Sequence, residues 1–281
     1  SKLSDGGLLK DAVNADPSAW LGQKHVEKFG VSTEVLVKLL DPDQRLPVHY
    51  HPDQRFAKEK LHLNHGKTEA WIILEAPAGA RVGLGFSKQM DKSEVAKLVK
   101  AHDSEALLDS LVFKEVKPGD AVFVPAGVAH AIEAGIFVLE LQEPTDLSIL
   151  LEWDGFAVDG DKDGHLNLGY ETALDALRLS PLTKAENDEI FTGFDSSSPK
   201  SHSIFKSVAN PFFRADYLTG DEQKVEAGFG IFLCLSGEGE LVFENSENLS
   251  VKSGDAVVIP FAAGSFTVSN CVGILSRPPA A

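Results

Sequence analysis

Two stretches of this chain repeat one another. KPGDAVFVPAGVAHAI, from Lys117, aligns without gaps with KSGDAVVIPFAAGSFT, from Lys252. Each copy has Gly-Asp for a turn, then an apolar strand, then a Pro that ends the strand. Two such copies far apart in the sequence predict two β-barrels. Because Ser265 stands in the second copy where the first has His130, we expect any functional site in the first barrel.

The residues around the first copy have the pattern of short strands. Apolar residues between positions 33 and 150 alternate with period two or form short blocks that Gly and Pro interrupt, as in TEVLVKLL, EAWIILEA, RVGLGF and IFVLELQ. Apolar residues at three and four spacing predict helices over 8–22 and 92–111, and YETALDALRL predicts another. The expected fold is mostly β, with a helical N-terminal segment and a helical insertion.

This pattern predicts three parts in the chain. We expect a metal-bearing barrel with helical elements over 1–153, then a loop, short helices and a linker over 154–203, and a metal-free barrel over 204–281. A chain of 281 residues with 43% hydrophobic residues is long enough to form two cores.

The net charge and the cysteine content indicate which classes of binding partner are excluded and which cellular compartment is expected. A net charge of −16 argues against nucleic-acid and anionic-membrane partners, because both need a basic surface. No stretch approaches the roughly 20 apolar residues of a membrane span, and no signal-like segment opens the chain, so we expect a cytoplasmic protein. Cys234 and Cys271 lie in apolar runs and are expected to be buried free thiols, with a disulfide as the weaker alternative.

LPVHYH places two histidines two residues apart on a predicted strand. His49 and His51 therefore point to the same face, and Glu69 on the next strand segment and His130 at the end of another can converge with them. Three histidines and one glutamate suit Zn, Mn, Fe, Co or Ni, and leave open positions for water or substrate. The sequence therefore predicts a catalytic divalent metal site.

Other interpretations of these motifs are possible. A histidine pair can simply decorate an exposed strand, and His62 and His65 in KLHLNHGK are alternative ligands that we expect to be mostly solvated. GKT is not a P-loop, because the glycine required five positions before Gly66 is Leu61. DGDKDG lacks the spaced acids and the closing Glu of an EF-hand calcium loop.

HPD, GKTE, PGDAVFVPAGVAHAI and LELQEPTDL, in this order, resemble the type I phosphomannose isomerases of the mannose-6-phosphate isomerase family. The resemblance covers nearly the whole chain. It implies two cupin (jelly-roll) barrels with one metal, zinc by preference, in the first barrel. It also implies that His51, Glu69 and His130 are ligands and that His49 replaces the family's ligand glutamine.

The resemblance also implies roles for residues around the metal. Lys67 matches an active-site lysine, and Lys38 matches a lysine near the sugar phosphate. Glu140 matches a family glutamate, either the base or a partner of a ligand. Trp71 shares the face of Glu69 by strand parity, so we expect it to contact substrate. Lys67 could instead form a simple ion pair with Glu143 or Asp146.

Three departures from the family are visible. Pro47 replaces a serine on the phosphate side, and Leu150 replaces an active-site arginine. Arg45 and Arg55 flank the predicted metal strand, and we expect Arg55 to act in catalysis in place of the missing arginine. The family's opening strands are also absent before SKLSDGG, which fits a shortened relative or an incomplete record.

The expected function is metal-dependent aldose–ketose isomerisation of a sugar or sugar phosphate through an enediol, with mannose 6-phosphate and fructose 6-phosphate as the first choice. Two alternatives remain. Pro47 and Leu150 favour a noncatalytic carbohydrate-binding protein. Three histidines and one glutamate can also hold Fe or Mn, as in a cupin oxygenase.

Overall fold

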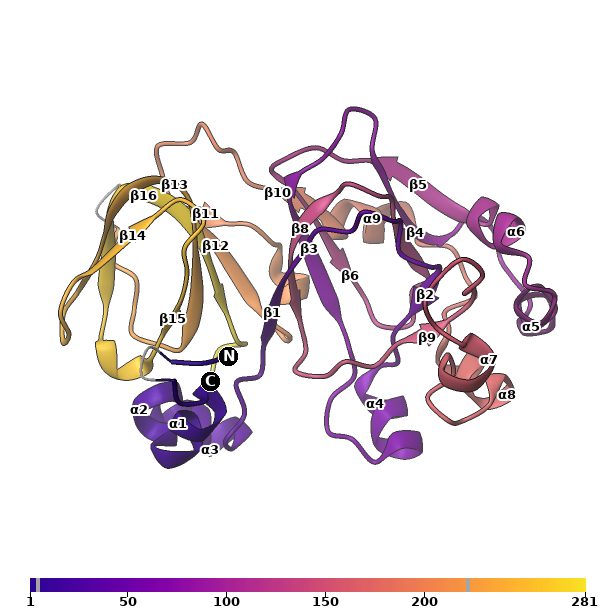
Figure 1. Ribbon diagram of the computed structural model, residues 1–281, viewed down its shortest axis with the longest axis horizontal. Coiled ribbons are helices and arrows are strands. Elements are labelled where there is room, and N and C mark those ends of the chain that lie inside the picture. The colour runs from indigo at the N-terminus through magenta and orange to yellow at the C-terminus, as the bar shows by residue number, and fades with distance from the viewer. Residues whose placement is uncertain (4–5, 221–222) are drawn as a thin grey trace. The chain divides into compact units, whose positions relative to one another are not determined.

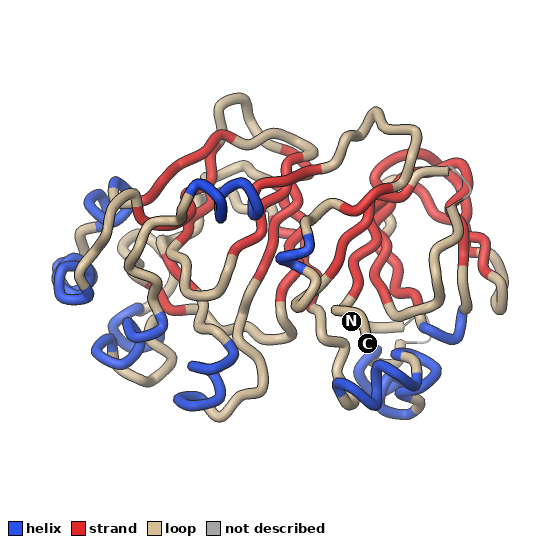
Figure 2. The backbone as a smooth tube through the Cα atoms, turned by 180° about the vertical axis from the view of Figure 1, so that it is seen from behind, coloured by secondary structure: helices blue, strands red, loops and turns tan. Residues whose placement is uncertain are grey.

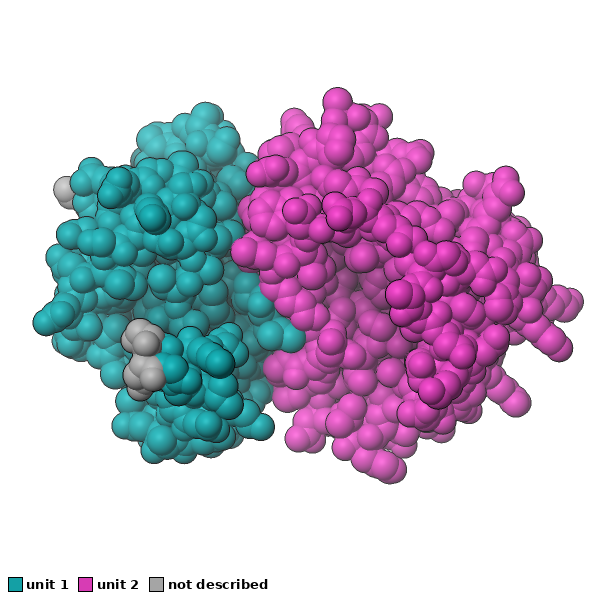
Figure 3. Space-filling view, in the orientation of Figure 1, with its two compact units in different colours: residues 1–37, 194–281 teal, residues 38–193 magenta. Residues whose placement is uncertain are grey.

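The computed structural model describes residues 1–3, 6–220 and 223–281. Contacts divide the chain into two compact units (Figure 3). We call Lys38–Gly193 the central unit, and Ser1–Val37 together with Phe194–Ala281 the terminal unit. Each unit is built around β-sheet, as expected, with helices at its edges (Figures 1 and 2).

The central unit contains two five-stranded sheets. One has the strand order β1-β8-β3-β6-β10 and the other has the order β5-β4-β7-β2-β9. The strands are β1 (Leu36–Leu40), β2 (His49–Tyr50), β3 (Glu69–Glu75), β4 (Arg81–Phe86), β5 (Leu111–Glu115), β6 (Asp120–Val124), β7 (His130–Ile132), β8 (Phe137–Gln142), β9 (Ile149–Leu150) and β10 (Phe191–Gly193). Neighbours in these sheets are distant in the sequence, so ladder pairing brings remote side chains together.

Strand β3, which carries Glu69, lies in the interior of its sheet. It pairs with β6 on one side and β8 on the other, and its first five residues are all buried. Trp71 lies opposite both Val122 and Glu140 in register. Because paired residues share a face, Glu69, Trp71 and Glu140 point to the same side of this sheet.

The helical insertion is broken in two, where a single helix over 92–111 was expected. Helix α5 (Lys92–Ala101) ends at His102, which has the left-handed conformation, and α6 (Ser104–Asp109) begins after Asp103. The Asp103 side chain accepts a hydrogen bond from the Ala106 N–H and so caps the second helix. The apolar residues keep the 3.6-residue period across this break, so the sequence pattern does not indicate the boundary between the two helices.

The other helices of the central unit are short. The DGDKDG stretch contains one of them, α7, and the predicted helix YETALDALRL divides into α8 and a 3₁₀ turn. The elements are α4 (Gln54–Phe56), η1 (Ala57–Leu61), α7 (Gly160–Asp163), α8 (Tyr170–Ala173), η2 (Leu174–Ala176) and α9 (Lys184–Ile190).

The terminal unit has one six-stranded sheet. Its strand order is β11-β12-β16-β13-β14, and β15 pairs with β13. The strands are β11 (His202–Ser203), β12 (Arg214–Leu218), β13 (Gly230–Phe243), β14 (Leu249–Lys252), β15 (Ala256–Ile259) and β16 (Phe266–Arg277), with 3₁₀ turns η3 (Ser207–Ala209) and η4 (Phe261–Ala263). Cys234 and Cys271 are buried free thiols in its core, as expected.

The N-terminal helices belong to the terminal unit, which differs from the expected domain boundaries. Two short helices, α1 (Leu9–Ala15) and α2 (Pro17–Leu21), replace the single helix expected over 8–22, and a third, α3 (Gln23–Phe29), follows them. Asp16 separates α1 from α2, since its side chain caps the second helix and Pro17 occupies the first helical position. Helix α2 contacts η4 of the same unit (Figure 1).

The middle part of the chain also groups differently from the expectation. Strand β10 pairs with β6, so residues up to Gly193 belong to the central unit rather than to a separate linker region. In the described part of the chain, no helix has both the length and the apolar character needed to cross a membrane.

Candidate metal centre

Three histidines converge in the central unit. His49 on β2 lies opposite His130 on β7, and their Nε2 atoms are 3.0 Å apart. His51 follows β2, and its ring centroid lies 5.0 Å from that of His49 and 4.9 Å from that of His130. One ring nitrogen from each of the three residues lies within 4.8 Å of the others, a spacing at which they could hold one metal ion.

Backbone carbonyls orient all three rings. The Nδ1 atoms of His49, His51 and His130 lie 2.8, 2.6 and 2.8 Å from the carbonyl oxygens of Pro47, Leu147 and Val128, respectively. A nitrogen that faces a carbonyl carries the proton, so each Nε2 presents a lone pair. Two lone pairs that face each other across 3.0 Å repel unless a cation lies between or beside them. The ring orientations therefore fit a metal ion.

Burial keeps these imidazoles neutral. It is the largest cause that lowers the pKa of His49 to about 3, of His51 to about 4 and of His130 to about 3. Glu69 opposes the shift, but burial prevails. Neutral imidazole is the form that binds metals, so the cluster needs no deprotonation near neutral pH.

Glu69 adds a carboxylate beside the histidines. Its Oε2 lies 3.0 Å from His51 Nε2, and its Oε1 lies 3.4 Å from His130 Nε2. Burial alone would raise the pKa of Glu69, but His51 and Lys67 beside it lower that pKa well below its usual range. Three imidazole nitrogens and one ionised carboxylate form a donor set that suits zinc and other first-row divalent ions.

Trp71 holds the carboxylate of Glu69 in place through a hydrogen bond. Its indole Nε1–H donates to Glu69 Oε1 at 2.9 Å, and its ring centroid lies 5.4 Å from that of His130. The side chain has no exposed surface. Trp71 thus orients a candidate ligand, and its expected contact with substrate stays a prediction.

Lys67 is a buried cation within the same cluster. Its Nζ donates to Glu69 Oε2 at 2.6 Å and to His51 Nε2 at 2.9 Å, and its side chain is 5% exposed. The alternative pairing with Glu143 or Asp146 is not found. Glu143 accepts the Thr68 N–H, and Asp146 accepts from Lys38.

Lys67 is positioned by a tight loop contact. Its backbone N–H donates to the Pro52 carbonyl at 3.0 Å, one residue after His51. A Cβ on Gly66 would lie 2.6 Å from that same oxygen, so only glycine allows the two segments to approach this closely. The G-K-T-E motif thereby brings the lysine and the glutamate to the histidines.

Glu140 lies beside the cluster on β8, opposite Trp71 in register. It is 4% exposed, and burial followed by the charge of Glu69 raises its pKa to about 7. Its Oε2 is 3.7 Å from Lys38 Nζ. A buried carboxylate with a pKa near neutrality has the properties of a general base.

Lys38 on β1 connects Glu140 to the surface. Its Nζ donates to Asp146 Oδ1 at 2.9 Å, and its side chain is 28% exposed. Burial alone would lower the pKa of Lys38, but the Asp146 hydrogen bond and the charge of Glu140 raise it. Lys38 therefore stays cationic and partly accessible at the edge of the site.

Several predicted residues do not reach the cluster. Arg55, expected to be catalytic, has a side chain that is 84% exposed, and its nearest ion-pair partner is Glu59 at 3.8 Å on the next helical turn. This placement argues against the prediction, because a short helix directs the guanidinium to solvent. His62 and His65 also lie outside the three-histidine group. His62 is exposed, as expected of a loop residue.

Glu152 is a functional candidate that sequence reasoning missed. Its Oε1 accepts the Val48 N–H at 2.8 Å, immediately before His49, and its two oxygens receive the guanidinium of Arg45. Arg45 therefore holds this strand in place rather than substituting for a missing arginine. The available signal was an acid two residues after β9, but only the pairing of β9 with β2 shows that this acid lies beside the chain that enters β2.

No family model matches the chain, but curated proteins are similar to it. Mannose-6-phosphate isomerase ManA from Bacillus subtilis (strain 168) is 33% identical to this chain over 247 residues, which cover 87% of this chain and 73% of ManA.

Solved structures have the same fold. A mutant of phosphomannose isomerase from Salmonella typhimurium superposes with a TM-score of 0.75 at 16% identity, over 99% of this chain and 87% of that one. A zinc-bound mannose 6-phosphate isomerase superposes with a TM-score of 0.72 at 16% identity, over 97% of this chain and 85% of that one. These proteins are cupins, so the expected mostly-β cupin fold is confirmed.

Proposed function

Because this chain belongs to the mannose-6-phosphate isomerase family, we propose that it is a metal-dependent aldose–ketose isomerase that interconverts mannose 6-phosphate and fructose 6-phosphate. The observation that carries the proposal is the set of three neutral, carbonyl-oriented imidazoles beside an ionised glutamate. Neither a noncatalytic sugar-binding protein nor an oxygenase is favoured by the relatives.

The reaction sets the chemical requirements. An aldose and a ketose interconvert when a proton moves between C2 and C1 and the intermediate is an enediol. The site must therefore remove a proton from carbon, return it to the neighbouring carbon, and stabilise negative charge on two adjacent sugar oxygens.

We propose that His49, His51, Glu69 and His130 hold one divalent ion, with zinc as our first choice. Zinc is preferred because a mannose 6-phosphate isomerase of the same fold is described as zinc-bound. When bound, the ion supplies Lewis-acid polarisation of the sugar oxygens. The Nδ1–H bonds to the carbonyls of Pro47, Leu147 and Val128 keep the rings aligned for that ion.

Glu140 is our candidate for the base that moves the proton between C2 and C1. It is buried beside Glu69, and a pKa of about 7 lets it take a proton and return it near neutral pH. Lys67 is our candidate donor to the sugar oxygens, because its ammonium already lies between Glu69 and His51. We assign Lys38, partly exposed beside Glu140, to the substrate's anionic group.

The same assignments define the partner and the compartment that we propose. The substrate is a small sugar phosphate, and the protein acts in the cytoplasm. Buried thiols at Cys234 and Cys271 that form no disulfide are typical of a reducing compartment.

Proton NMR in heavy water tests this function. The zinc-loaded protein is incubated with mannose 6-phosphate, free mannose or lyxose, and the C2 proton signal is followed. We expect the C2 signal of mannose 6-phosphate to disappear while the ketose appears. Exchange with free mannose alone would show that Pro47 and Leu150 have removed the preference for phosphate.

A matched variant tests the role of Glu140. Glu140→Gln keeps the size of the side chain but removes the base, so it should bind one equivalent of zinc and lose at least about 100-fold in exchange rate. Exchange at the wild-type rate would remove Glu140 from the mechanism. No exchange by the zinc-loaded wild type on any of the three sugars would contradict the proposed isomerase.

A further inference from the structure

The terminal unit contains a cavity lined by two arginines that have no carboxylate within ion-pair distance in the described part of the chain. The cavity has a volume of about 530 Å³, and Arg214 and Arg277 both line it. All of its lining residues belong to the terminal unit, whereas every candidate metal ligand belongs to the central unit. The cavity is therefore separate from the site described above.

The two arginines are placed side by side by strand pairing. Arg214 begins β12 and Arg277 ends β16, and the antiparallel register puts them directly opposite each other. Like charges directly opposite on neighbouring strands are destabilising. Among the residues that the structure describes, neither guanidinium has a carboxylate within ion-pair distance.

Arg277 is the less satisfied of the two guanidiniums. The residue is 8% exposed, and its buried Nε–H has no hydrogen-bond partner. Its Nη2 donates to the Glu226 carbonyl, and Arg214 Nε donates to the Pro278 carbonyl at 3.0 Å. Burial, and then the charge of Arg214, lower the pKa of Arg277 to about 10. Buried cations in proteins are normally paired. The charges of Asp216 and of Glu226, which also lines the cavity, oppose this shift, but among the described residues neither carboxylate lies within ion-pair distance of Arg277.

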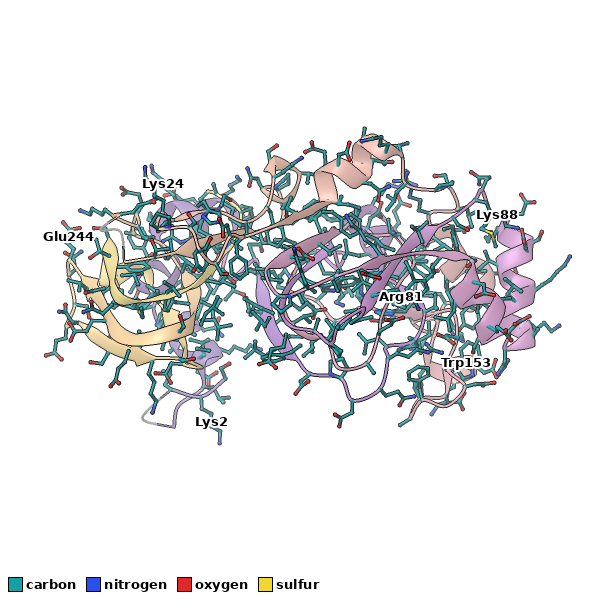
Figure 4. The ribbon with its side chains drawn as sticks, turned by 90° about the horizontal axis from the view of Figure 1, so that it is seen from above. Lys2, Lys24, Arg81, Lys88, Trp153 and Glu244 are labelled. Atoms are coloured by element: carbon teal, nitrogen blue, oxygen red, sulfur yellow. The ribbon has the colours of Figure 1, made fainter. Side chains whose placement is uncertain are left out.

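Other basic groups at the cavity are already engaged or exposed. A ring nitrogen of His25 lies 2.7 Å from the Ser32 carbonyl oxygen, and Lys28 nearby donates to the Ala280 carbonyl at 2.8 Å. Lys24, labelled in Figure 4, is an exposed part of the lining. Two unpaired arginines and an exposed lysine gather here on a chain whose net charge is −16.

The remaining walls of the cavity are largely apolar. They include Leu21 from α2, Phe229 before β13 and Phe261 from η4. Leu21 and Phe229 are each 3% exposed, whereas Phe261 is 40% exposed and leaves one side open to a ligand. Aromatic and aliphatic walls with a few convergent polar groups are typical of small-molecule sites.

We propose that the terminal unit binds a small organic anion, whose carboxylate or phosphate lies between Arg214 and Arg277 and whose apolar part contacts Phe229 and Phe261. A guanidinium fork matches either head group. The ligand relieves the repulsion between the two arginines and thereby stabilises the pairing of β12 with β16.

Calorimetric titration of the zinc-loaded full chain tests the proposal with benzoate, phenyl phosphate, inorganic phosphate and benzyl alcohol. We expect one equivalent of benzoate or phenyl phosphate to bind and to raise the unfolding temperature. The better of the two identifies the head group. Benzyl alcohol lacks the charge and should not bind, and inorganic phosphate lacks the apolar part and should bind at least about tenfold more weakly.

Two variants locate the binding. Arg214→Gln, at the half-buried position, should weaken binding by at least about tenfold, and Arg277→Lys should do the same because it keeps the charge but loses the planar fork. Arg81→Gln, in the central unit, is the control and should leave affinity unchanged (Figure 4). Circular dichroism verifies that each variant is folded.

Three results would overturn the proposal. One is the absence of binding by either organic anion up to 10 millimolar, the second is equal binding of inorganic phosphate, and the third is unchanged affinity in both folded arginine variants. The first result does not depend on any variant. None of them bears on isomerase activity, because the candidate metal centre lies in the other unit.

Discussion

The arrangement of the candidate metal centre is set residue by residue through hydrogen bonds to the main chain. Each of the three histidines uses Nδ1 for a carbonyl, and each carbonyl comes from a different loop or strand end. The Nε2 atom of every ring is thus turned toward the cluster, where that of His51 also accepts a hydrogen bond from Lys67. The carboxylate of Glu69 is held in turn by Trp71 and Lys67. The main chain and these two side chains therefore orient the candidate ligands.

Replacing single histidines tests this assignment. His51→Ala or His130→Ala removes one of four donors, so each should lower bound zinc well below one equivalent, as measured by elemental analysis after dialysis. His62→Ala is the matched control, since His62 is exposed and outside the group, and it should retain one equivalent. Loss of zinc in the control, with retention in His51→Ala, would move the site to the loop histidines.

At the scale of elements, the candidate ligands depend on a very short strand. Strand β2 has two residues and pairs with β7 and β9 at its two edges. A strand this short gains little stability from its own backbone hydrogen bonds to the neighbouring strands. The ion pair between Glu152 and Arg45, together with the bond from the Val48 N–H to Glu152, fixes the chain where it enters β2. The position of His49 thus rests on a carboxylate outside the metal centre.

Glu152→Gln tests this support. The change removes the ion pair and leaves Arg45 without its anion, which should lower the free energy of unfolding by about 2 kcal/mol. We expect zinc affinity to fall by about 10-fold to 100-fold, as measured by competition with a chelator.

Glu186→Gln is the matched control for that experiment. Glu186 also receives an arginine fork, from Arg178, and a backbone N–H, from Thr183, but it lies in α9 away from the histidine strands. It should lose stability without losing zinc affinity. Equal losses of affinity in the two variants would show that the effect comes from general destabilisation.

At the scale of the whole molecule, the two units share a repeated sequence pattern but differ in the chemistry of their side chains. The Gly-Asp turn and the strand after it recur in both, in β6 and in β15. The first copy has His130 where the second has Ser265, and among the described residues the three-histidine group lies in the central unit. The Ser265 hydroxyl instead donates to Glu244.

Metal binding should therefore stabilise one unit more than the other. Zinc at 100 times its dissociation constant adds about 2.7 kcal/mol to the unit that binds it. Amides of β3 and β8 that exchange by unfolding of the central unit should then slow by about 100-fold on adding zinc, as measured by hydrogen exchange with mass spectrometry. Amides of β12 and β16 should change little. Equal slowing in both units would show that they unfold together.

The sequence by itself determined the class of this fold and the chemistry available to it. The repeat indicated two barrels, and strand parity predicted that His49 and Glu69 point inward with their neighbours at two-residue spacing. These features are local, because alternation along a strand depends only on neighbouring residues. The zinc-type donor set followed from residue types alone.

Only the tertiary structure decided which residues meet. Residues 1–37 belong to the terminal unit, the Arg55 side chain points to solvent, and Arg45 forms an ion pair with Glu152. The tertiary structure also buries Trp71 under Glu69 and sets Arg214 opposite Arg277. The physical reason is that register between strands distant in the sequence is fixed by packing and hydrogen bonding across the whole sheet, which no local pattern records.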